Sequence, residues 1–218
     1  MNLYLGVVYD AMRELGYKDQ DFYINIKPKG GYSGLISGPA LTTFGRKTDI
    51  SEDYAALDNI RLNIYKRELF EKRPIVLLQS NDSYVAHSGD ITSLIYQTLG
   101  AVGFITDGNV RDIERISELN FPCFCEDVNP IDALDYWALT NFNVPIEVKG
   151  VEISPGDMIY ASKDGVIRVP LEILNEFEGK VKAILEKENN IRSIILDMKD
   201  SADFTSEFET FVENSGRW

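Results

Sequence analysis

The sequence contains few residues of the kinds that bind zinc or cross-link a chain: two cysteines and one histidine among 218 residues. Cys123 and Cys125 are one residue apart, and His87 is distant from both along the chain. A structural zinc site takes four Cys or His ligands, which is more than the chain supplies. We therefore expect the cysteines to be small residues of a buried strand.

Long apolar runs and an excess of basic residues are also missing. No apolar run approaches the ~20 residues that span a bilayer, and residues 1–6 lack the charged start of a signal peptide. Acidic residues outnumber basic ones by 35 to 22, which gives a net charge of −13, whereas nucleic-acid binders usually carry a basic footprint. We expect a cytoplasmic protein that binds neither membranes nor nucleic acid.

The stretch from Gly89 to Asp112 carries the strongest pattern in the chain. Apolar residues follow Gly89 at spacings of three and four, which predicts a helix that ends at Gly100. Gly103–Ile105 has the character of a buried strand, and a polar turn follows it. The turn places Arg111 and Asp112 beyond the carboxyl end of that strand, where α/β sheets bind their ligands.

Elsewhere, periodicity and turn residues predict alternating helices and strands. Helices are expected at residues 3–16, 51–72, 113–119, 130–139, 171–187 and 203–213. Strands are expected at 21–27, 34–43, 75–78, 84–86, around 123, and at 144–148, 158–161 and 166–169, with the 34–43 strand interrupted by Gly38-Pro39. The alternation indicates an α/β fold, and the group of strands at 144–169 indicates a partly antiparallel, mixed sheet.

Two carboxylates and one guanidinium in the central stretch could form an active site. Asp90 and Asp112 are 22 residues apart, the length of a helix plus a strand, so both should return to the same sheet edge. The alternative is structural: an Asp at this position caps the next helix, and its neighbouring Arg forms a salt bridge. Mg²⁺ is commonly held by only one or two carboxylates, and Arg111 could stabilise charge that develops on a substrate oxygen.

The start of the predicted helix could bind the carboxylate of a substrate. Backbone N–H groups of Ile91 and Thr92 would point at such an anion, and Gly89 lets the backbone approach closely. His87, just before them, is expected to make local hydrogen bonds. Arg46 and Arg115 are expected to be solvated charges, with binding of a distal substrate carboxylate as the alternative. Turn roles are expected for Asp107, Gly108, Asp157 and Asp164.

Several of these residues fall in blocks that resemble the signature of the RraA-like family. The blocks are Gly89-Asp90-Ile91, the Gly100/Gly103 pair and Asp107-Gly108-Asn109-Val110-Arg111-Asp112, with flanking agreement at 34–43, 154–157 and 164–170. The family contains the regulator of ribonuclease activity A and the metal-dependent 4-hydroxy-4-methyl-2-oxoglutarate aldolases. The resemblance covers about residues 4–170.

The resemblance implies a β/β/α swivelling-domain sandwich that assembles as a homotrimer or a hexamer. The chain would be one domain, 1–218, with its core at 4–170 and a C-terminal helical extension at 171–218. By the same resemblance, Arg111 contacts pyruvate, Asp112 ligates Mg²⁺ or Mn²⁺, and Asp90 acts through metal-bound water. Glu186 or Glu188 of a neighbouring subunit would complete the site.

The function that follows from the resemblance is a metal-dependent, class II pyruvate aldolase or 2-oxo-acid lyase. It would act through a metal-stabilised pyruvate enolate, and oxaloacetate decarboxylation uses the same chemistry. The sequence leaves one alternative open: a non-catalytic RraA-like protein that binds and regulates a ribonuclease, for which the acidic charge suits a basic partner.

Overall fold

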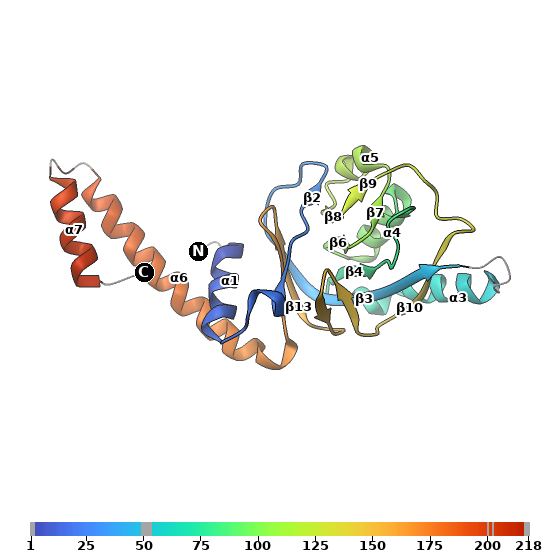
Figure 1. The fold of residues 1–218 in the computed structure, drawn as a ribbon, viewed down its shortest axis with the longest axis horizontal. Helices are drawn as coiled ribbons and strands as arrows, with labels where there is room; N and C mark the ends of the chain where they lie inside the picture. Colours follow the sequence, from blue (N-terminus) through green and yellow to red (C-terminus); the bar gives the residue numbers. More distant parts are fainter. Residues whose placement is uncertain (1–2, 49–53, 200, 202, 216–218) are drawn as a thin grey trace.

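The computed structural model describes residues 3–48, 54–199, 201 and 203–215 (Figure 1). Its helices are α1 (Leu5–Glu14), α2 (Asp19–Phe22), α3 (Tyr54–Ile64), α4 (Asp90–Leu99), α5 (Ile113–Glu118), α6 (Leu174–Met198) and α7 (Phe204–Ser215), with 3₁₀ turns η1 (Arg67–Phe70) and η2 (Leu171–Ile173). Its longer strands are β3 (Ile36–Lys47), β4 (Ile75–Gln79), β6 (Gly103–Thr106), β10 (Trp137–Phe142), β13 (Met158–Ser162) and β14 (Gly165–Val169). Its short strands are β1 (Tyr23–Ile24), β2 (Pro28–Lys29), β5 (Ala86–Ser88), β7 (Asn109–Val110), β8 (Cys123–Phe124), β9 (Asp127–Val128), β11 (Ile146–Val148) and β12 (Val151–Ile153).

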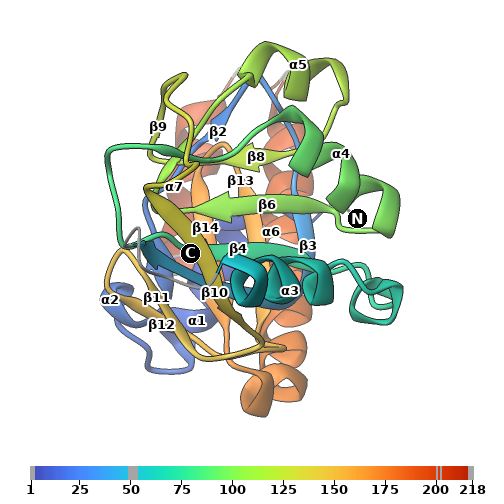
Figure 2. The ribbon, with the colours of Figure 1, turned by 90° about the vertical axis from the view of Figure 1, so that its right-hand side faces the viewer.

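A mixed sheet forms the centre of the molecule, with the order β1-β14-β13-β3-β4-β6-β8-β2 and β10 paired with β3. The three inner pairs, β3/β4, β4/β6 and β6/β8, are parallel, and the outer pairs are antiparallel. Figure 2 shows β4, β6 and β8 side by side, with α4 and α5 beside them. The mixed α/β architecture expected from the sequence is confirmed.

Alternate residues of β4 face two different cores. Ile75 and Leu77 belong to the core between the parallel strands and the outer strands of the sheet. Val76 and Leu78 belong to the core that contains Tyr96 of α4. Because all four side chains are almost completely buried, each stabilises the fold by roughly 1.5–3 kcal/mol, which explains the unbroken apolar run of this strand.

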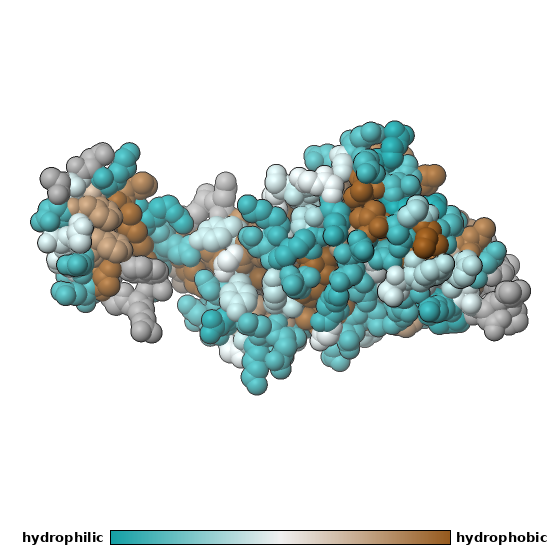
Figure 3. All heavy atoms as spheres, turned by 45° about the horizontal axis from the view of Figure 1, so that its top comes forward, coloured by the Kyte–Doolittle hydropathy of each residue, from teal (hydrophilic) through white to brown (hydrophobic). Residues whose placement is uncertain are grey.

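A third core joins the N-terminal and C-terminal helices to the outer strands. It brings Tyr160 of β13 against Phe177 of α6, with ring centroids 5.6 Å apart. Beyond this core α6 runs away from the sheet, and α7 folds back beside it (Figure 1). Figure 3 shows apolar side chains on these two helices and in patches on the body.

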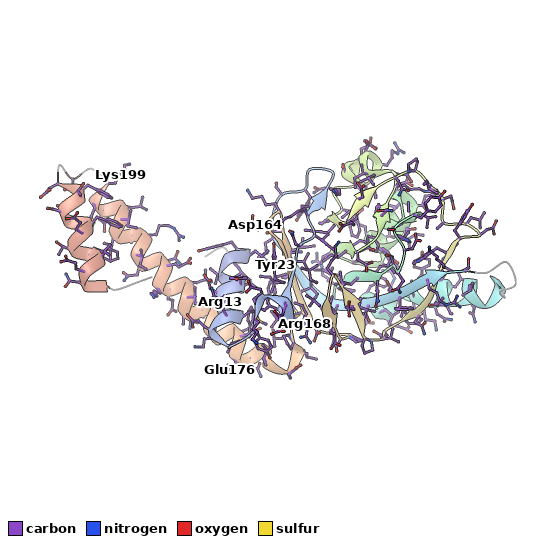
Figure 4. All side chains as sticks on the ribbon, viewed as in Figure 1. Arg13, Tyr23, Asp164, Arg168, Glu176 and Lys199 are labelled. Carbon is purple, nitrogen blue, oxygen red and sulfur yellow. The ribbon has the colours of Figure 1, made fainter. Side chains whose placement is uncertain are left out.

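At the sheet edge, the Tyr23 phenol donates a hydrogen bond to the Asp164 carbonyl oxygen at 3.1 Å (Figure 4).

Strand β3 differs from the expected interrupted strand. It runs through Gly38 and Pro39 without a break, because it changes partners there, from β13 before this point to β4 after it. A Cβ at Gly38 would lie 2.7 Å from the carbonyl oxygen of Arg73, so this crossing needs a residue without a side chain. The strand predicted at 21–27 is shorter, at Tyr23–Ile24, and it is an edge strand as expected.

The helix predicted at 130–139 is wrong. Residues 130–136 form loops and turns, and Trp137 begins β10, which pairs with β3 in the register Trp137↔Lys47. The helix predicted at 51–72 is α3 followed by η1; residues 51–53 lie outside the described part of the chain.

The cysteines are buried and unbridged, as expected, with Cys123 in β8. Among the described residues, no helix has both the length and the apolar character that crossing a membrane requires.

Candidate active site

A second, small parallel sheet extends the carboxyl ends of the central strands. Each of β4, β6 and β8 is followed by a short strand, and these short strands pair in the order β5-β7-β9. Ser88 pairs with Val110, and the N–H of Arg111 donates to the carbonyl oxygen of Ser88 at 3.0 Å. The small sheet therefore places Gly89 beside Arg111, although 22 residues separate them in the chain.

Helix α4 begins directly at this junction. Gly89 is its N-cap and provides no side-chain cap, and the N–H of Ser93 bonds to the Gly89 carbonyl oxygen at 3.0 Å. The N–H of Ile91 bonds to Oδ1 of Asp90 at 2.8 Å. N–H groups in the first turn of a helix have no partner within the helix, and they carry the positive end of its dipole. The start of α4 thus has the polarity that favours a bound carboxylate.

Asp112 occupies the N-cap position of α5, but its carboxylate makes no capping hydrogen bond. Its backbone is left-handed, with φ 58° and ψ 36°, a conformation that is uncommon for a residue other than glycine. A Cβ built on Gly89 would lie 2.8 Å from Oδ2 of Asp112. The carboxylate therefore lies over the Gly89 backbone, and its position argues against the purely structural reading as a helix cap.

Arg111 lies between two carboxylates. Its Nε is 3.4 Å from Oδ2 of Asp112, and its Nη1 is 2.5 Å from Oδ2 of Asp132. The hydrogen bond to Asp132 is the main cause that raises the pKa of Arg111, and the negative charges of Asp112 and Asp90 add to it. The pKa of Asp132 is lowered by the N–H of Leu134 and by Arg111. Arg111, Asp112 and Asp90 are thus gathered within electrostatic reach of one another.

His87 is a buried, neutral hydrogen-bonding residue, as expected. Its Nδ1 accepts from the N–H of Asn109 at 3.2 Å, so its Nε2 carries the proton and donates to Oδ2 of Asp82 at 3.2 Å. Burial lowers the pKa of His87, and Asp82 only partly opposes this shift. The ring packs against Trp137 with centroids 4.8 Å apart. These contacts hold the His87 ring in place.

A cavity of about 330 Å³ opens beside the start of α4. Its wall includes Ser88, Ile91 and Thr92 from the α4 junction, and Asp132 from the loop that carries the partner of Arg111. Within the described residues, Oγ of Ser88 is buried and has no hydrogen-bond partner, and such orphaned groups are uncommon in native proteins. The cavity therefore borders the α4 junction at Ser88, Ile91 and Thr92 and borders Asp132, the partner of Arg111.

Two carboxylates are the donor set that the site offers to a metal. No group of three or more His, Cys, Asp or Glu side chains gathers anywhere in the described ranges, so a closed zinc-type cage is not present there. The carboxylates of Asp90 and Asp112 are of the chemical type that hard cations such as Mg²⁺ and Mn²⁺ prefer, since these ions take oxygen ligands and often only one or two from the protein.

Other residues singled out in the sequence make structural contacts. Asp157 has the turn role expected of it, because its Oδ2 accepts a hydrogen bond from the N–H of Ser154 at 2.8 Å, and the same oxygen accepts one from Nε of Arg168 at 2.7 Å. Asp107 joins two strand ends, since its Oδ1 accepts a hydrogen bond from the N–H of Ser80 at 2.7 Å. The N–H of Asp164 bonds to Ser162 Oγ within a turn. Arg115 pairs with Glu118 on the surface, and Arg46 bonds to the carbonyl oxygen of Lys47.

The two glutamates expected to reach a neighbouring subunit lie on α6. Figure 1 places α6 on the opposite side of the molecule from α4. Oε2 of Glu188 lies 3.8 Å from Nη2 of Arg192. Glu188 also lines a separate hollow between α1 and α6. Neither glutamate contributes to the site of its own chain.

Asp132 was not predicted from the sequence. A helix was expected around it, whereas its Oδ1 accepts the N–H of Leu134 in a local turn and its Oδ2 holds Arg111. The Asn129-Pro130 dipeptide, which marks a turn, was the signal against a helix. The contact with Arg111 joins residues 21 positions apart, and nothing in the local pattern indicates it.

The fold and the Gly89–Asp112 arrangement define a class of mixed α/β proteins with an Arg-Asp pair next to a helix start. The model of the RraA-like family, described as Aldolase/RraA, matches residues 6–168. The chain therefore belongs to the RraA-like family, and the resemblance seen in the sequence is confirmed.

Other proteins are similar to the chain in sequence or in fold. A protein of Halalkalibacterium halodurans, named "Putative 4-hydroxy-4-methyl-2-oxoglutarate aldolase", is 36% identical over 124 residues, 56% of this chain and 55% of that protein. The chain thus spans about half the length of this curated relative. An uncharacterised Pseudomonas syringae protein has a TM-score of 0.74 at 20% identity, over 94% of this chain and 92% of that one. Streptomyces coelicolor RraAS2, described as an unusual member of the RNase ES inhibitor RraA family, has a TM-score of 0.70 at 20% identity, over 87% and 90% of the two chains.

Proposed function

We propose that this protein is a metal-dependent lyase that cleaves a carbon–carbon bond of a 2-oxo acid and releases pyruvate. The observation that carries the proposal is the convergence of Arg111, Asp112 and Asp90 at the open start of α4. The name of the Halalkalibacterium halodurans relative supports a 4-hydroxy-4-methyl-2-oxoglutarate aldolase type of reaction. Oxaloacetate decarboxylation, which also gives the pyruvate enolate, is the second expected activity.

The residues of the chain bind and orient the substrate. The N–H groups of Ile91 and Thr92 bind the carboxylate of the 2-oxo acid, and that of Ile91 exchanges Oδ1 of Asp90 for the substrate when it does so. Gly89 allows the close approach of the carboxylate. The Arg111 guanidinium donates to the keto oxygen, on which negative charge develops as the bond to C3 breaks. Because Asp112 and Asp132 hold Arg111 from two sides, the guanidinium is oriented before the substrate binds.

Proton transfer falls to Asp90. In the retro-aldol reaction the C3–C4 bond breaks, its electron pair passes to C3, and the 4-hydroxyl loses its proton as it becomes a carbonyl. The enolate then takes a proton at C3 to give pyruvate. Asp90 is the carboxylate at the start of α4 that we assign to this proton movement, directly or through water.

Asp112 and Asp90 would hold the divalent metal, Mg²⁺ or Mn²⁺. Bound there, the metal would supply Lewis-acid stabilisation of the oxygen that gains charge. The carboxylate of Asp112 makes no helix-capping hydrogen bond, and the Asp112 side chain is 40% exposed. It is therefore available to coordinate such an ion.

The test is pyruvate release from 4-hydroxy-4-methyl-2-oxoglutarate and from oxaloacetate, with Mg²⁺, with Mn²⁺ and with EDTA. We expect turnover that requires metal and is lost in Asp112→Asn, while Asp164→Asn, a change in a remote surface turn, keeps it. Metal-independent turnover, or full activity in Asp112→Asn, would remove the proposal.

A ribonuclease-binding protein is the second candidate. The net charge of −13 would suit a basic partner surface, and the shared fold with RraAS2 is compatible with it. A folded protein that releases no pyruvate from either compound, yet lowers the activity of a ribonuclease added to it, would favour this function.

We further propose that the chain assembles as a homotrimer or a hexamer. Large apolar side chains are exposed around the site, and they include Ile91 at 70%, Leu134 at 71% and Leu94 at 48%. Apolar residues exposed as a group commonly mark a protein interface. A site placed at such an interface could receive Glu186 or Glu188 from a neighbour.

A further inference from the structure

Helix α6 carries an apolar seam that extends along most of its length. The seam has a period of about 3.5 residues, with alternating steps of four and three, and one of its members is charged. Its members are Phe177, Val181, Ile184, Glu188, Ile191, Ile195 and Met198. Helices with this period pack side by side, each with its seam against that of its partner. These residues, called the α6 seam below, therefore predict a second helix alongside α6.

The rest of the chain covers only the first half of the α6 seam. Phe177 and Ile184 are buried in the core that α6 shares with α1, and Val181 packs against that core. Beyond Ile184, α6 runs away from the body (Figure 1). Among the described residues from 185 to 214, none is buried. Because most helical stability in proteins comes from burial of an apolar face, the second half of the seam lacks the cover that the first half has.

A hollow of about 710 Å³ opens along this uncovered half, between α6 and α1. Its wall on α6 extends from Ile184 to Leu196, a length of about 18 Å at about 1.5 Å per residue. Among the described residues, no member of α7 lines it, so α7 leaves this face of α6 open. Charged side chains of both signs from α1 and α6 surround apolar ones from α6. An apolar stripe with charged flanks is the surface that one amphipathic helix presents to another.

The charged member of the seam has an unsatisfied oxygen. Oε2 of Glu188 is buried and has no hydrogen-bond partner within the described residues. Nη2 of Arg192 is 3.8 Å from it, which is too far for a hydrogen bond, and Nη1 of Arg192 donates to Oδ1 of Asn189 at 2.8 Å. A buried acceptor without a donor is unfavourable. A partner with a basic side chain at this point would supply the missing donor.

A second copy of α6 has the features that this partner needs. In an antiparallel pair centred between residues 189 and 190, Ile184 lies opposite Ile195, and Glu188 lies opposite Ile191. Arg192 of the second copy follows that Ile191 directly, so its guanidinium would reach the unsatisfied oxygen of Glu188. Because such a pair has two-fold symmetry, each contact forms twice. A single polar residue in a seam also fixes which residues of the two helices meet.

We infer that the second half of the α6 seam is an interface with α6 of a second copy of this chain. The interface lies on the opposite side of the molecule from α4 (Figure 1), so it is separate from the assembly surface proposed around the site. A trimer formed at α4 and pairing at α6 together give a hexamer. Glu188 then belongs to the pairing, which leaves Glu186 as the glutamate that could complete a neighbour's site.

Light scattering of the full chain tests the pairing through the molar mass. We expect the parent protein to have an even multiple of the chain mass of 24.6 kDa. Ile195→Glu would place a charge opposite Ile184 of the second copy, and it should halve that mass. The control is Leu62→Glu on α3, at a side chain that is 68% exposed and outside the hollow, and it should keep the parent mass.

An exchange of charges at Glu188 and Arg192 shows whether these two residues meet across copies. Glu188→Arg alone puts two cations together at each contact, and Arg192→Glu alone puts two carboxylates together. Each variant should therefore have half the parent mass. In an equimolar mixture of the two variants, one chain supplies the cations and the other the carboxylates, so the parent mass should return. Circular dichroism melting checks that each variant folds.

Three results would overturn the inference. The first is a parent protein with an odd multiple of the chain mass, a single chain included. The second is a parent mass that persists in Ile195→Glu and in both charge variants. The third is a mixture of the charge variants that stays at half the parent mass although both melt cooperatively. None of these results bears on pyruvate release, so the proposed function stands or falls separately.

Discussion

The carboxylate of Asp112 lies against the backbone of Gly89, so close that a Cβ at residue 89 would be 2.8 Å from its Oδ2. The two residues come from different helix starts, and the pairing of β5 with β7 brings them together. This contact explains why the position needs glycine: the reason is space for a neighbouring side chain, since the φ of −151° is accessible to any residue.

Replacing Gly89 by alanine should damage the site more than the fold. The new Cβ would also lie 3.1 Å from Cγ of Arg111, so both functional side chains must shift. We expect pyruvate release to fall at least tenfold, with a loss of unfolding free energy of about 1–3 kcal/mol, as for other overpacked sites. Steady-state kinetics and urea unfolding measure the two effects.

Gly179→Ala is the matched control for that variant. Gly179 lies inside α6, and a Cβ there meets nothing within 4 Å. We expect it to raise stability by about 0.5–1 kcal/mol, because alanine is the better helix former, and to leave activity unchanged. Equal activity losses in the two variants would show that the space beside Asp112 is not what matters.

Arg111→Lys keeps the charge but removes the planar, forked donor. Lysine cannot hold Asp132 and a substrate oxygen in the same fixed geometry, so we expect kcat/KM to fall by about 10²–10³, in line with the loss of an oxyanion donor. Stability should change by less than about 1 kcal/mol, because the ion pairs are partly exposed. Arg115→Lys, which changes a surface pair with Glu118, serves as control and should be fully active.

His87 should make the stability of the fold depend on pH in a defined window. Burial lowers its pKa in the folded protein, so the unfolded chain binds more protons as the pH falls through the ordinary histidine pKa of about 6.5. The free energy of unfolding should therefore decrease as the pH falls below about 7, and it should level off above that pH. The pKa of Asp82 is lowered because hydrogen bonds outweigh its desolvation, and its contribution changes only at more acidic pH.

Because His87 is the only histidine, urea unfolding at several pH values can assign this slope to it. In His87→Gln the slope between about pH 7 and about pH 5.5 should vanish, while overall stability falls through lost buried hydrogen bonds. A slope that persists unchanged in the variant would mean that other groups titrate in this window.

Assembly through the exposed apolar residues near the site predicts an effect of Leu94→Glu. Leu94 lies on α4 and is 48% exposed, so a charge there is harmless to a monomer but costly in an apolar interface. Light scattering should give a trimer or hexamer for the parent protein and a smaller species for the variant. A monomeric parent protein would contradict the assembly proposal.

The parts of the fold that follow local rules were predictable from the sequence. The spacing of apolar residues after Gly89 and the stop at Gly100, which has φ 118°, define α4 correctly. The Arg111–Asp112 pair was placed correctly at a helix entry after a buried strand. The prediction of a helix at 130–139 failed because Trp137 is held by distant partners: its indole N–H donates to the carbonyl oxygen of Ser80, and its backbone pairs with β3.

The site was only partly predictable for the same reason. Asp90 and Asp112 could be expected to share a sheet edge, since a helix and a strand separate them. The small β5-β7-β9 sheet, the contact of Arg111 with Asp132 and the cavity depend on three or more segments meeting in space. Contacts of this kind leave no periodic trace in the sequence.

The central claim is that this site forms the enolate of pyruvate, and exchange of the pyruvate methyl protons for deuterium tests it most directly. The measurement is proton NMR of pyruvate in D₂O with the protein and Mg²⁺, and it needs no knowledge of the natural substrate. The account predicts exchange well above the uncatalysed rate, abolished by EDTA and by Asp112→Asn and at least tenfold slower in Arg111→Lys. No exchange above background by the folded parent protein, at a pyruvate concentration where binding is measured, would contradict the enolate mechanism.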